Sequence, residues 1–206
     1  MVSVRLYVEG GGQSKALRAQ CRRGFAQFLS RAGLAGRMPR VVACGARTDA
    51  FKSFALACTA ARAEGDSILL VDAEGPVSAA NPWDHLSTQD GWKRPSGARE
   101  GQCQLMVQCM ESWFLADREA LSRYFGQGFQ TSSLPAGNEV EKVGKQEVLF
   151  GLDRAARPTA KGGYAKGEHS FRLLGLLDPG LVARAAPSAA RLLAELGAQP
   201  APGTGP

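Results

Sequence analysis

Residues 67–75, with the sequence SILLVDAEG, are the stretch from which the fold of this 206-residue chain can be predicted. Four consecutive apolar residues follow Ser67, as expected for a short strand of a parallel sheet that is covered on both faces. The run ends in two carboxylates, Asp72 and Glu74. Because ligands of open α/β sheets bind beyond the carboxyl ends of the strands, these acids stand where a functional site is expected.

Strand and helix patterns alternate on the N-terminal side of this stretch. Residues 2–8 and 38–44 are short β-rich runs that predict two further strands. Apolar residues recur at helical spacing over 13–32, and a second helix is predicted from about 48 to 65. The order strand, helix, strand, helix, strand predicts a parallel sheet with right-handed crossovers.

The periodicity stops after the third predicted strand. Residues 75–101 form a long polar segment rich in Pro, Gly and Trp, which we expect to be a lid or a short subdomain with one helical turn. Residues 104–109 predict a fourth strand, which runs directly into a helix over 111–125.

The last third of the chain predicts a helical C-terminal part over 141–196. Helices are expected at Lys145–Ala156, from His169 to Leu177 and at Pro187–Leu196, and the Pro/Gly tail 197–206 is expected to be disordered. The prediction is therefore one α/β domain over 1–196, with a mainly parallel sheet of about four strands flanked by helices.

Composition and charge restrict the function classes. The chain has no run of roughly 18 apolar residues and opens on a strand in place of a signal peptide, so we expect a cytoplasmic protein without a membrane span. Its five cysteines lack CxxC spacing and are expected to be reduced. Residues 1–40 carry eight Lys and Arg against one acidic residue. This basic first helix would attract a polyanion, although a solvated helix face explains it nearly as well.

Carboxylates follow several of the predicted strands. Glu9 ends the first strand, Glu111 ends the fourth, and Asp117 lies about two turns into the next helix. Together with Asp72 and Glu74, they are predicted to converge on one rim of the sheet. Converging carboxylates repel one another unless a cation neutralises them, and oxygen-only ligands favour Mg²⁺ or Mn²⁺. Two such ions could support an in-line phosphoryl displacement, in which Glu111 and Asp117 complete the second site or orient water.

Glycines and basic residues complete the expected site. Glycines after Glu9 would let a substrate phosphate and the next helix N-terminus approach the metal. The segment 161–169, KGGYAKGEH, supplies cations for the phosphate, with Lys166 as the main candidate. Lys145 is interpreted as another phosphate contact or as the start of a helix. The candidate substrate contacts are Gly10, Gly11, Arg18, Lys161, Lys166 and His169.

Other chemistries have no motif in this sequence. GGGQSK, at 10–15, lacks the spacing of a P-loop, and no GxGxxG or GxSxG motif occurs. Two histidines without paired cysteines argue against a zinc enzyme.

Four motifs in order, LYVEGG, LLVDAEGP, MVQCMESWFLAD and KGGYAKGEHSFRLL, resemble the bacterial family called domain of unknown function 4276 over roughly residues 3–196. That family looks Toprim-like and is similar to the nuclease domains of the overcoming-lysogenization-defect proteins. The resemblance implies a metal-dependent phosphodiester site whose strand-one glutamate and strand-three D-x-D correspond to Glu9, Asp72 and Glu74. Glu74 departs from the pattern, which has Asp there, but its extra methylene can still reach a metal.

These features predict a Toprim-like nuclease that cleaves DNA or RNA, with the resemblance implying a phage-defence or mobile-element module. The alternative is a non-catalytic interaction subunit that docks on an ATPase partner, since the chain has no nucleotide-hydrolysis motif of its own. A small-molecule phosphohydrolase is a third hypothesis. The apolar segment Trp113–Phe125 could serve a homodimer.

Overall fold

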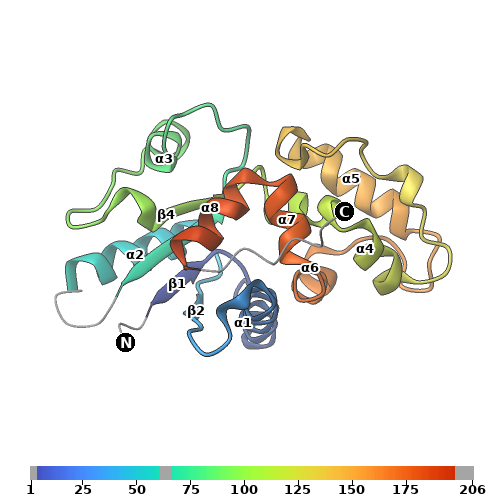
Figure 1. Ribbon diagram of the computed structural model, residues 1–206, viewed down its shortest axis with the longest axis horizontal. Coiled ribbons are helices and arrows are strands. Elements are labelled where there is room, and N and C mark those ends of the chain that lie inside the picture. The colour runs from blue at the N-terminus through green and yellow to red at the C-terminus, as the bar shows by residue number, and fades with distance from the viewer. Residues whose placement is uncertain (1–3, 61–65, 198–206) are drawn as a thin grey trace.

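The protein is described by a computed structural model, which covers residues 4–60 and 66–197. Four parallel strands form one sheet in the order β2-β1-β3-β4 (Figure 1). The strands are β1 (Arg5–Val8), β2 (Arg40–Ala43), β3 (Ser67–Asp72) and β4 (Cys103–Met106). The predicted α/β class with a parallel sheet of four strands is confirmed. β2 and β4 are shorter than the β-rich runs of the sequence, whereas β3 extends to Asp72.

Helices cover both faces of the sheet because its strands are apolar on both faces. Leu6 and Leu70 belong to an apolar core shared with α1, α6 and α8, whereas Tyr7 and Leu69 belong to a second core shared with α2 and α3. The N-terminal helices are α1 (Lys15–Leu29, continued by a π turn over Ser30–Leu34), α2 (Arg47–Ala60) and α3 (Pro82–Asp90). The C-terminal helices are α4 (Arg118–Phe125), α5 (Lys145–Ala156), α6 (Lys166–Leu174), α7 (Pro179–Ala185) and α8 (Pro187–Glu195).

The strand order places a topological switch point between β1 and β3. The chain leaves β1 through α1 to reach β2 on one side, and it leaves β3 through α3 to reach β4 on the other. Loops that follow the two central strands therefore diverge to opposite faces of the sheet, which opens a crevice at their carboxyl ends. Glu9 and Asp72 lie at this point.

The segment 75–101 corrects one prediction. It contains the nine-residue helix α3, not a single turn, because Asn81 caps the helix and Pro82 occupies its first position. Trp83 packs against Phe54 of α2, and Trp92 stacks on Phe51 at 4.5 Å. The segment therefore covers the second face of the sheet and forms part of its core.

The predicted helix over 111–125 is divided in two. Residues Met110–Ala116 form 3-10 turns, and Asp117 leaves helical geometry and caps α4. Trp113, Phe114 and Phe125 are buried within this chain, so the segment does not present the apolar face that a homodimer would use.

Farther along the chain, α5 has the predicted bounds, α6 begins three residues earlier than predicted, and α7 was not predicted. The expected disordered tail lies almost wholly outside the described residues.

Two further expectations can be compared with the structure. The five cysteines are free, and four of them are buried. Within residues 4–60 and 66–197, no helix is long and apolar enough to cross a membrane.

Candidate metal centre

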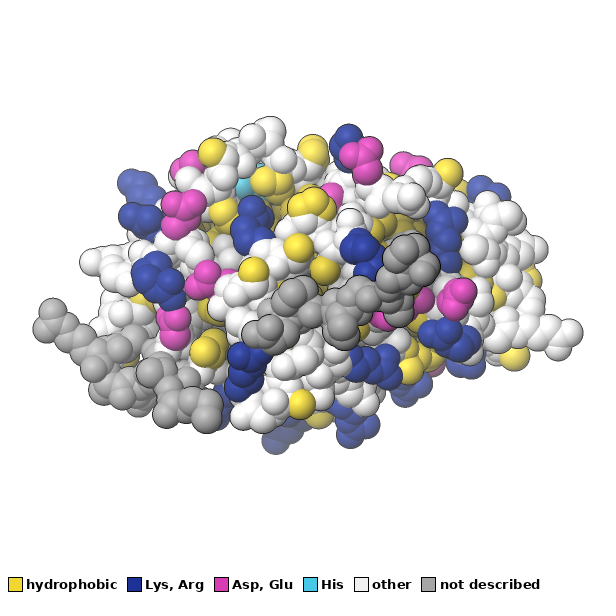
Figure 2. Space-filling view, viewed as in Figure 1, with side chains coloured by type: hydrophobic (Ala, Val, Ile, Leu, Met, Phe, Trp, Pro, Cys, Tyr) yellow, Lys and Arg dark blue, Asp and Glu magenta, His cyan; other side chains and the backbone are white. Residues whose placement is uncertain are grey.

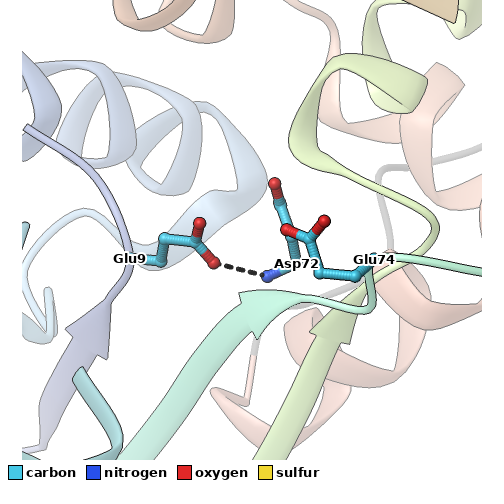
Figure 3. Close-up of side chains that lie close together, drawn as sticks. All are labelled: Glu9, Asp72 and Glu74. Carbon is cyan, nitrogen blue, oxygen red and sulfur yellow. Dashed lines mark hydrogen bonds between the residues drawn. The ribbon is translucent and has the colours of Figure 1, made fainter. Parts of the chain in front are cut away.

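Three carboxylates meet beyond the carboxyl ends of β1 and β3, as the sequence predicted (Figure 3). Oxygen atoms of Glu9, Asp72 and Glu74 all lie within 4.8 Å of one another. Since β1 and β3 are neighbours in register, with Val8 beside Leu70, the residues that follow them reach the same end of the sheet. The switch point thus brings residues that are 63 positions apart in sequence into one cluster.

Backbone hydrogen bonds fix two of these side chains. The amide of Asp72 donates to Oε2 of Glu9 at 3.1 Å (Figure 3). The amide of Met110 donates to Oδ1 of Asp72 at 2.8 Å. Asp72 is 2% exposed, and burial together with the nearby Glu9 charge raises its pKa to about 7. Burial also raises the pKa of Glu9. The backbone donors therefore do not fully stabilise the negative charges of Glu9 and Asp72.

Glu74 reaches the cluster through an unusual backbone conformation. Its φ of 65° lies in the left-handed region, which residues other than glycine rarely adopt. Its amide donates to the carbonyl of Gln108 at 2.9 Å, which fixes the turn. Lys145, at the start of α5, forms an ion pair with the Glu74 carboxylate at 2.6 Å. The sequence left Lys145 as either a phosphate contact or a helix start, and the structure places it at the acidic rim.

Lys166 lies on the other side of Asp72. Its Nζ is 3.5 Å from Asp72 Oδ2 and 3.6 Å from Glu111 Oε2. The lysine reaches the rim because α6 packs on α1, where Gly24 lets the backbone of Phe171 approach; a Cβ there would lie 2.3 Å from the Phe171 carbonyl oxygen. Burial works against the Lys166 charge, but the carboxylates of Glu111 and Asp72 outweigh it and hold its pKa above the ordinary value.

Glu111 does not share the cluster formed by the other three acids. Its side chain is fully buried, and its Oε1 accepts a hydrogen bond from the Tyr164 hydroxyl at 2.9 Å. Ser170 adds a longer hydrogen bond to the same oxygen. We expected Glu111 to be a metal ligand; it lies outside the group of three acids that could share an ion, and its Oε2 lies 3.6 Å from Lys166 Nζ.

Arg47 is a site residue that the sequence analysis missed. It begins α2, and its Nε donates to the carbonyl of Asp72 at 2.8 Å and lies 4.0 Å from Glu9 Oε2. The guanidinium also pairs with Asp90 and lies over the ring of Trp92. The rule that ligands bind beyond the carboxyl ends of parallel strands could have identified Arg47, because this residue follows the second predicted strand.

Four other predicted site residues have structural contacts. Asp117 accepts hydrogen bonds from the amides of Ala120 and Asp178 on its two carboxylate oxygens, and it is not among the described acids that lie close enough to share an ion.

His169 is buried and accepts a hydrogen bond from the amide of Ala165 on Nδ1, and burial lowers its pKa. Lys161 lies over the ring of Tyr124. Arg18 donates to the carbonyl of Gly12 and so supports the glycine loop.

A cavity of about 300 Å³ lies beside the acids and is lined by the glycine loop. Gly10 and Gly11 have φ values of 132° and 83°, and a Cβ on Gly11 would lie 2.7 Å from the Cα of Arg18. Gly10 also exchanges two backbone hydrogen bonds with Gly45. The glycines therefore permit both the tight turn and the open space next to Glu9. Lys166 lines the same cavity.

The donor set fits Mg²⁺ or Mn²⁺. Among the residues that the structure describes, Glu9, Asp72 and Glu74 are the one group of three or more potential ligands close enough to share an ion. All the donor atoms are carboxylate oxygens, which hard divalent cations prefer. A cation there would also offset the burial and the nearby Glu9 charge that raise the pKa of Asp72.

Comparison with known proteins identifies the family. The family model described as domain of unknown function (DUF4276) matches residues 8–197. No curated protein and no solved structure matches the chain. Because the family match spans nearly the whole sequence, the protein belongs to the DUF4276 family.

Proposed function

We propose that this protein is a Mg²⁺- or Mn²⁺-dependent nuclease that hydrolyses phosphodiester bonds of DNA or RNA. The observation that carries the proposal is the convergence of Glu9, Asp72 and Glu74 at the switch point of the sheet. Mg²⁺ or Mn²⁺ bound to these residues supplies the Lewis acidity that activates water and neutralises phosphate charge. The resemblance of the three acids to a Toprim-like set supports the same reaction.

Lys166 is the residue best placed to contact the scissile phosphate. Its side chain is about half exposed and lines the cavity next to the acids, while Asp72 and Glu111 hold its ammonium in place. A fixed cation at this position binds a phosphate oxygen and stabilises the charge that develops during hydrolysis. Glu111, Tyr164 and Ser170 act through Lys166, as positioning residues.

The surface of α1 supports a polymeric substrate. Lys15, Arg22 and Arg23 are exposed, and none forms an ion pair with a carboxylate of the described residues. Lys and Arg side chains gather in the lower part of the space-filling view, over α1 (Figure 2). The glycine loop joins β1 to this helix, so a nucleic acid that follows the basic surface would reach the acidic rim.

The proposal keeps the expectation of cytoplasmic action that was drawn from the sequence. The resemblance to defence nucleases adds a role in a phage-defence or mobile-element module and an ATPase partner.

Cleavage of supercoiled plasmid, single-stranded DNA and RNA should be measured with Mn²⁺ and with EDTA. We expect Mn²⁺-dependent cleavage of at least one substrate, and we expect the Glu9→Gln, Asp72→Asn double variant to abolish it. Glu119→Gln, which changes a fully exposed acid on α4, is the control. Full cleavage by the double variant would refute the proposal. A wild type that neither binds Mn²⁺ nor cleaves would favour the non-catalytic interaction subunit.

A further inference from the structure

The two lysines of the rim differ in what remains to hold them once a cation binds. Lys166 lies between Asp72 and Glu111, at 3.5 and 3.6 Å, and Glu111 is outside the cluster of candidate ligands. Lys145 lies 2.6 Å from Glu74 and 3.9 Å from Asp72, and both of these acids belong to the cluster. Lys166 therefore keeps a carboxylate partner in the loaded site, whereas Lys145 competes for the ligands themselves.

The backbone of Lys145 is fixed by a hydrogen bond, whereas, among the residues that the structure describes, only ion pairs hold its side-chain ammonium at the rim. Its amide donates to the side-chain oxygen of Gln108 at 3.2 Å, at the first position of α5. The backbone carbonyl of the same Gln108 accepts from the Glu74 amide, so one residue holds both members of the ion pair. A rotation of the lysine side chain, without movement of α5, is sufficient to break the pair.

We propose that the ammonium of Lys145 is the resident counter-cation of the metal-free site, and that it leaves Glu74 when a divalent cation binds there. The inference rests on the proposed function and deepens it. A divalent ion bound to Glu74 would lie close to an ammonium that is 2.6 Å from the same carboxylate, and like charges at such a distance repel, so the ammonium and the ion cannot share the cluster without a large cost. Once released, the Lys145 side chain is available to a substrate phosphate.

The first test is Mn²⁺ binding by calorimetry on the wild type and on Lys145→Gln. Removing the competing ammonium should tighten Mn²⁺ binding by about tenfold or more, the equivalent of roughly 1.4 kcal/mol. Lys142→Gln is the matched control, because Lys142 lies three residues away, is 75% exposed and pairs with Glu139 outside the cluster. The Mn²⁺ affinity of Lys142→Gln should equal that of the wild type.

The second test separates displacement from the effect of a nearby fixed charge. Reductive methylation of the wild type, followed by peptide mass spectrometry, reports how accessible each lysine is. Lys145 should be protected in EDTA and should become reactive with Mn²⁺, whereas Lys142 should be reactive in both conditions. Tighter binding by Lys145→Gln without this change would overturn the inference, because the lysine would then act from a fixed position.

The outcomes distinguish this inference from the proposed function. Mn²⁺ binding by the wild type, with neither an affinity gain in Lys145→Gln nor a change in labelling, would overturn the displacement and leave the nuclease proposal standing. An absence of binding in both proteins would overturn both. Binding by Lys145→Gln together with Mn²⁺-dependent exposure of Lys145 in the wild type would support the displacement whether or not any nucleic acid is cleaved.

Discussion

Two regions of the molecule each contain a buried aspartate, and the partners of the two carboxylates differ. In the helical part, Asp117 accepts a backbone hydrogen bond on each carboxylate oxygen, both at 2.9 Å. At the sheet rim, Asp72 accepts one such bond, and its second oxygen faces the two lysine ammonium groups. Other carboxylates surround Asp72, whereas backbone donors satisfy Asp117.

The comparison shows that burial does not separate the two carboxylates, whereas their partners do. Asp117 lines a cavity of about 510 Å³, larger than the one of about 300 Å³ beside Asp72, yet both of its oxygens accept backbone hydrogen bonds, which join two segments of the chain. Asp72 has a pKa raised to about 7, chiefly by burial and then by Glu9. A buried carboxylate in that state gains from a cation.

The largest expected difference between the two regions is in activity. Asp72→Asn should lower metal-dependent cleavage by at least about 1,000-fold and abolish calorimetric Mn²⁺ binding, because the variant loses the carboxylate at the centre of the cluster. Asp117→Asn should leave both properties of the folded protein within a few-fold of the wild type. Equal losses in the two variants would contradict the distinction drawn between them.

The second difference is the pH dependence of stability without metal. Folding raises the pKa of Asp72 from 3.8 to about 7, so between these values the native state keeps a proton that the unfolded chain has lost. The contribution of Asp72 is therefore present at pH 4 and is lost as the pH rises through about 7, by up to roughly 4 kcal/mol. Urea unfolding in EDTA at several pH values should show this loss in the wild type and in Asp117→Asn. In Asp72→Asn the loss should be smaller, because of the two rim acids with a raised pKa only Glu9 remains, and an unchanged pH dependence in that variant would contradict the assignment.

The third difference is in stability at a fixed pH. Asp117→Ala should lower the free energy of unfolding by about 2–3 kcal/mol, because two backbone amides lose their acceptor and α4 loses its cap. Denaturant unfolding at pH 7 would measure the change. Asp72→Asn should have a smaller effect or should stabilise the metal-free protein, since it removes a buried charge. The reverse order of the two variants would be inconsistent with the contacts described.

The smallest expected effect concerns the positioning of Lys166. Tyr164→Phe removes the 2.9 Å hydrogen bond to Glu111 without changing any candidate metal ligand. Cleavage should fall by roughly threefold to tenfold, consistent with the loss of about 1 kcal/mol, while Mn²⁺ affinity should stay unchanged. A parallel change in Mn²⁺ affinity would instead place Glu111 among the metal ligands.

The sequence by itself determined the α/β class, the strand order along the chain and the family. It also located Glu9, Asp72 and Glu74 at strand ends, because a short apolar run followed by an acid is a local pattern and parallel strands expose their carboxyl ends on one edge. The segment KGGYAKGEH also identified Lys166 as the main candidate cation. These features depend on residues that are close in sequence and on a general rule of sheet geometry.

Tertiary structure alone decided the contacts of Asp117, Glu111 and Lys145. Whether Asp117 faces a metal or caps α4 depends on where the helix begins, and the amide of Asp178 that completes its partners is 61 residues away. The pair between Lys145 and Glu74 joins residues 71 positions apart. Such contacts arise from the packing of distant helices against the sheet, and no local pattern of charge or hydrophobicity encodes which of several acids a lysine will meet.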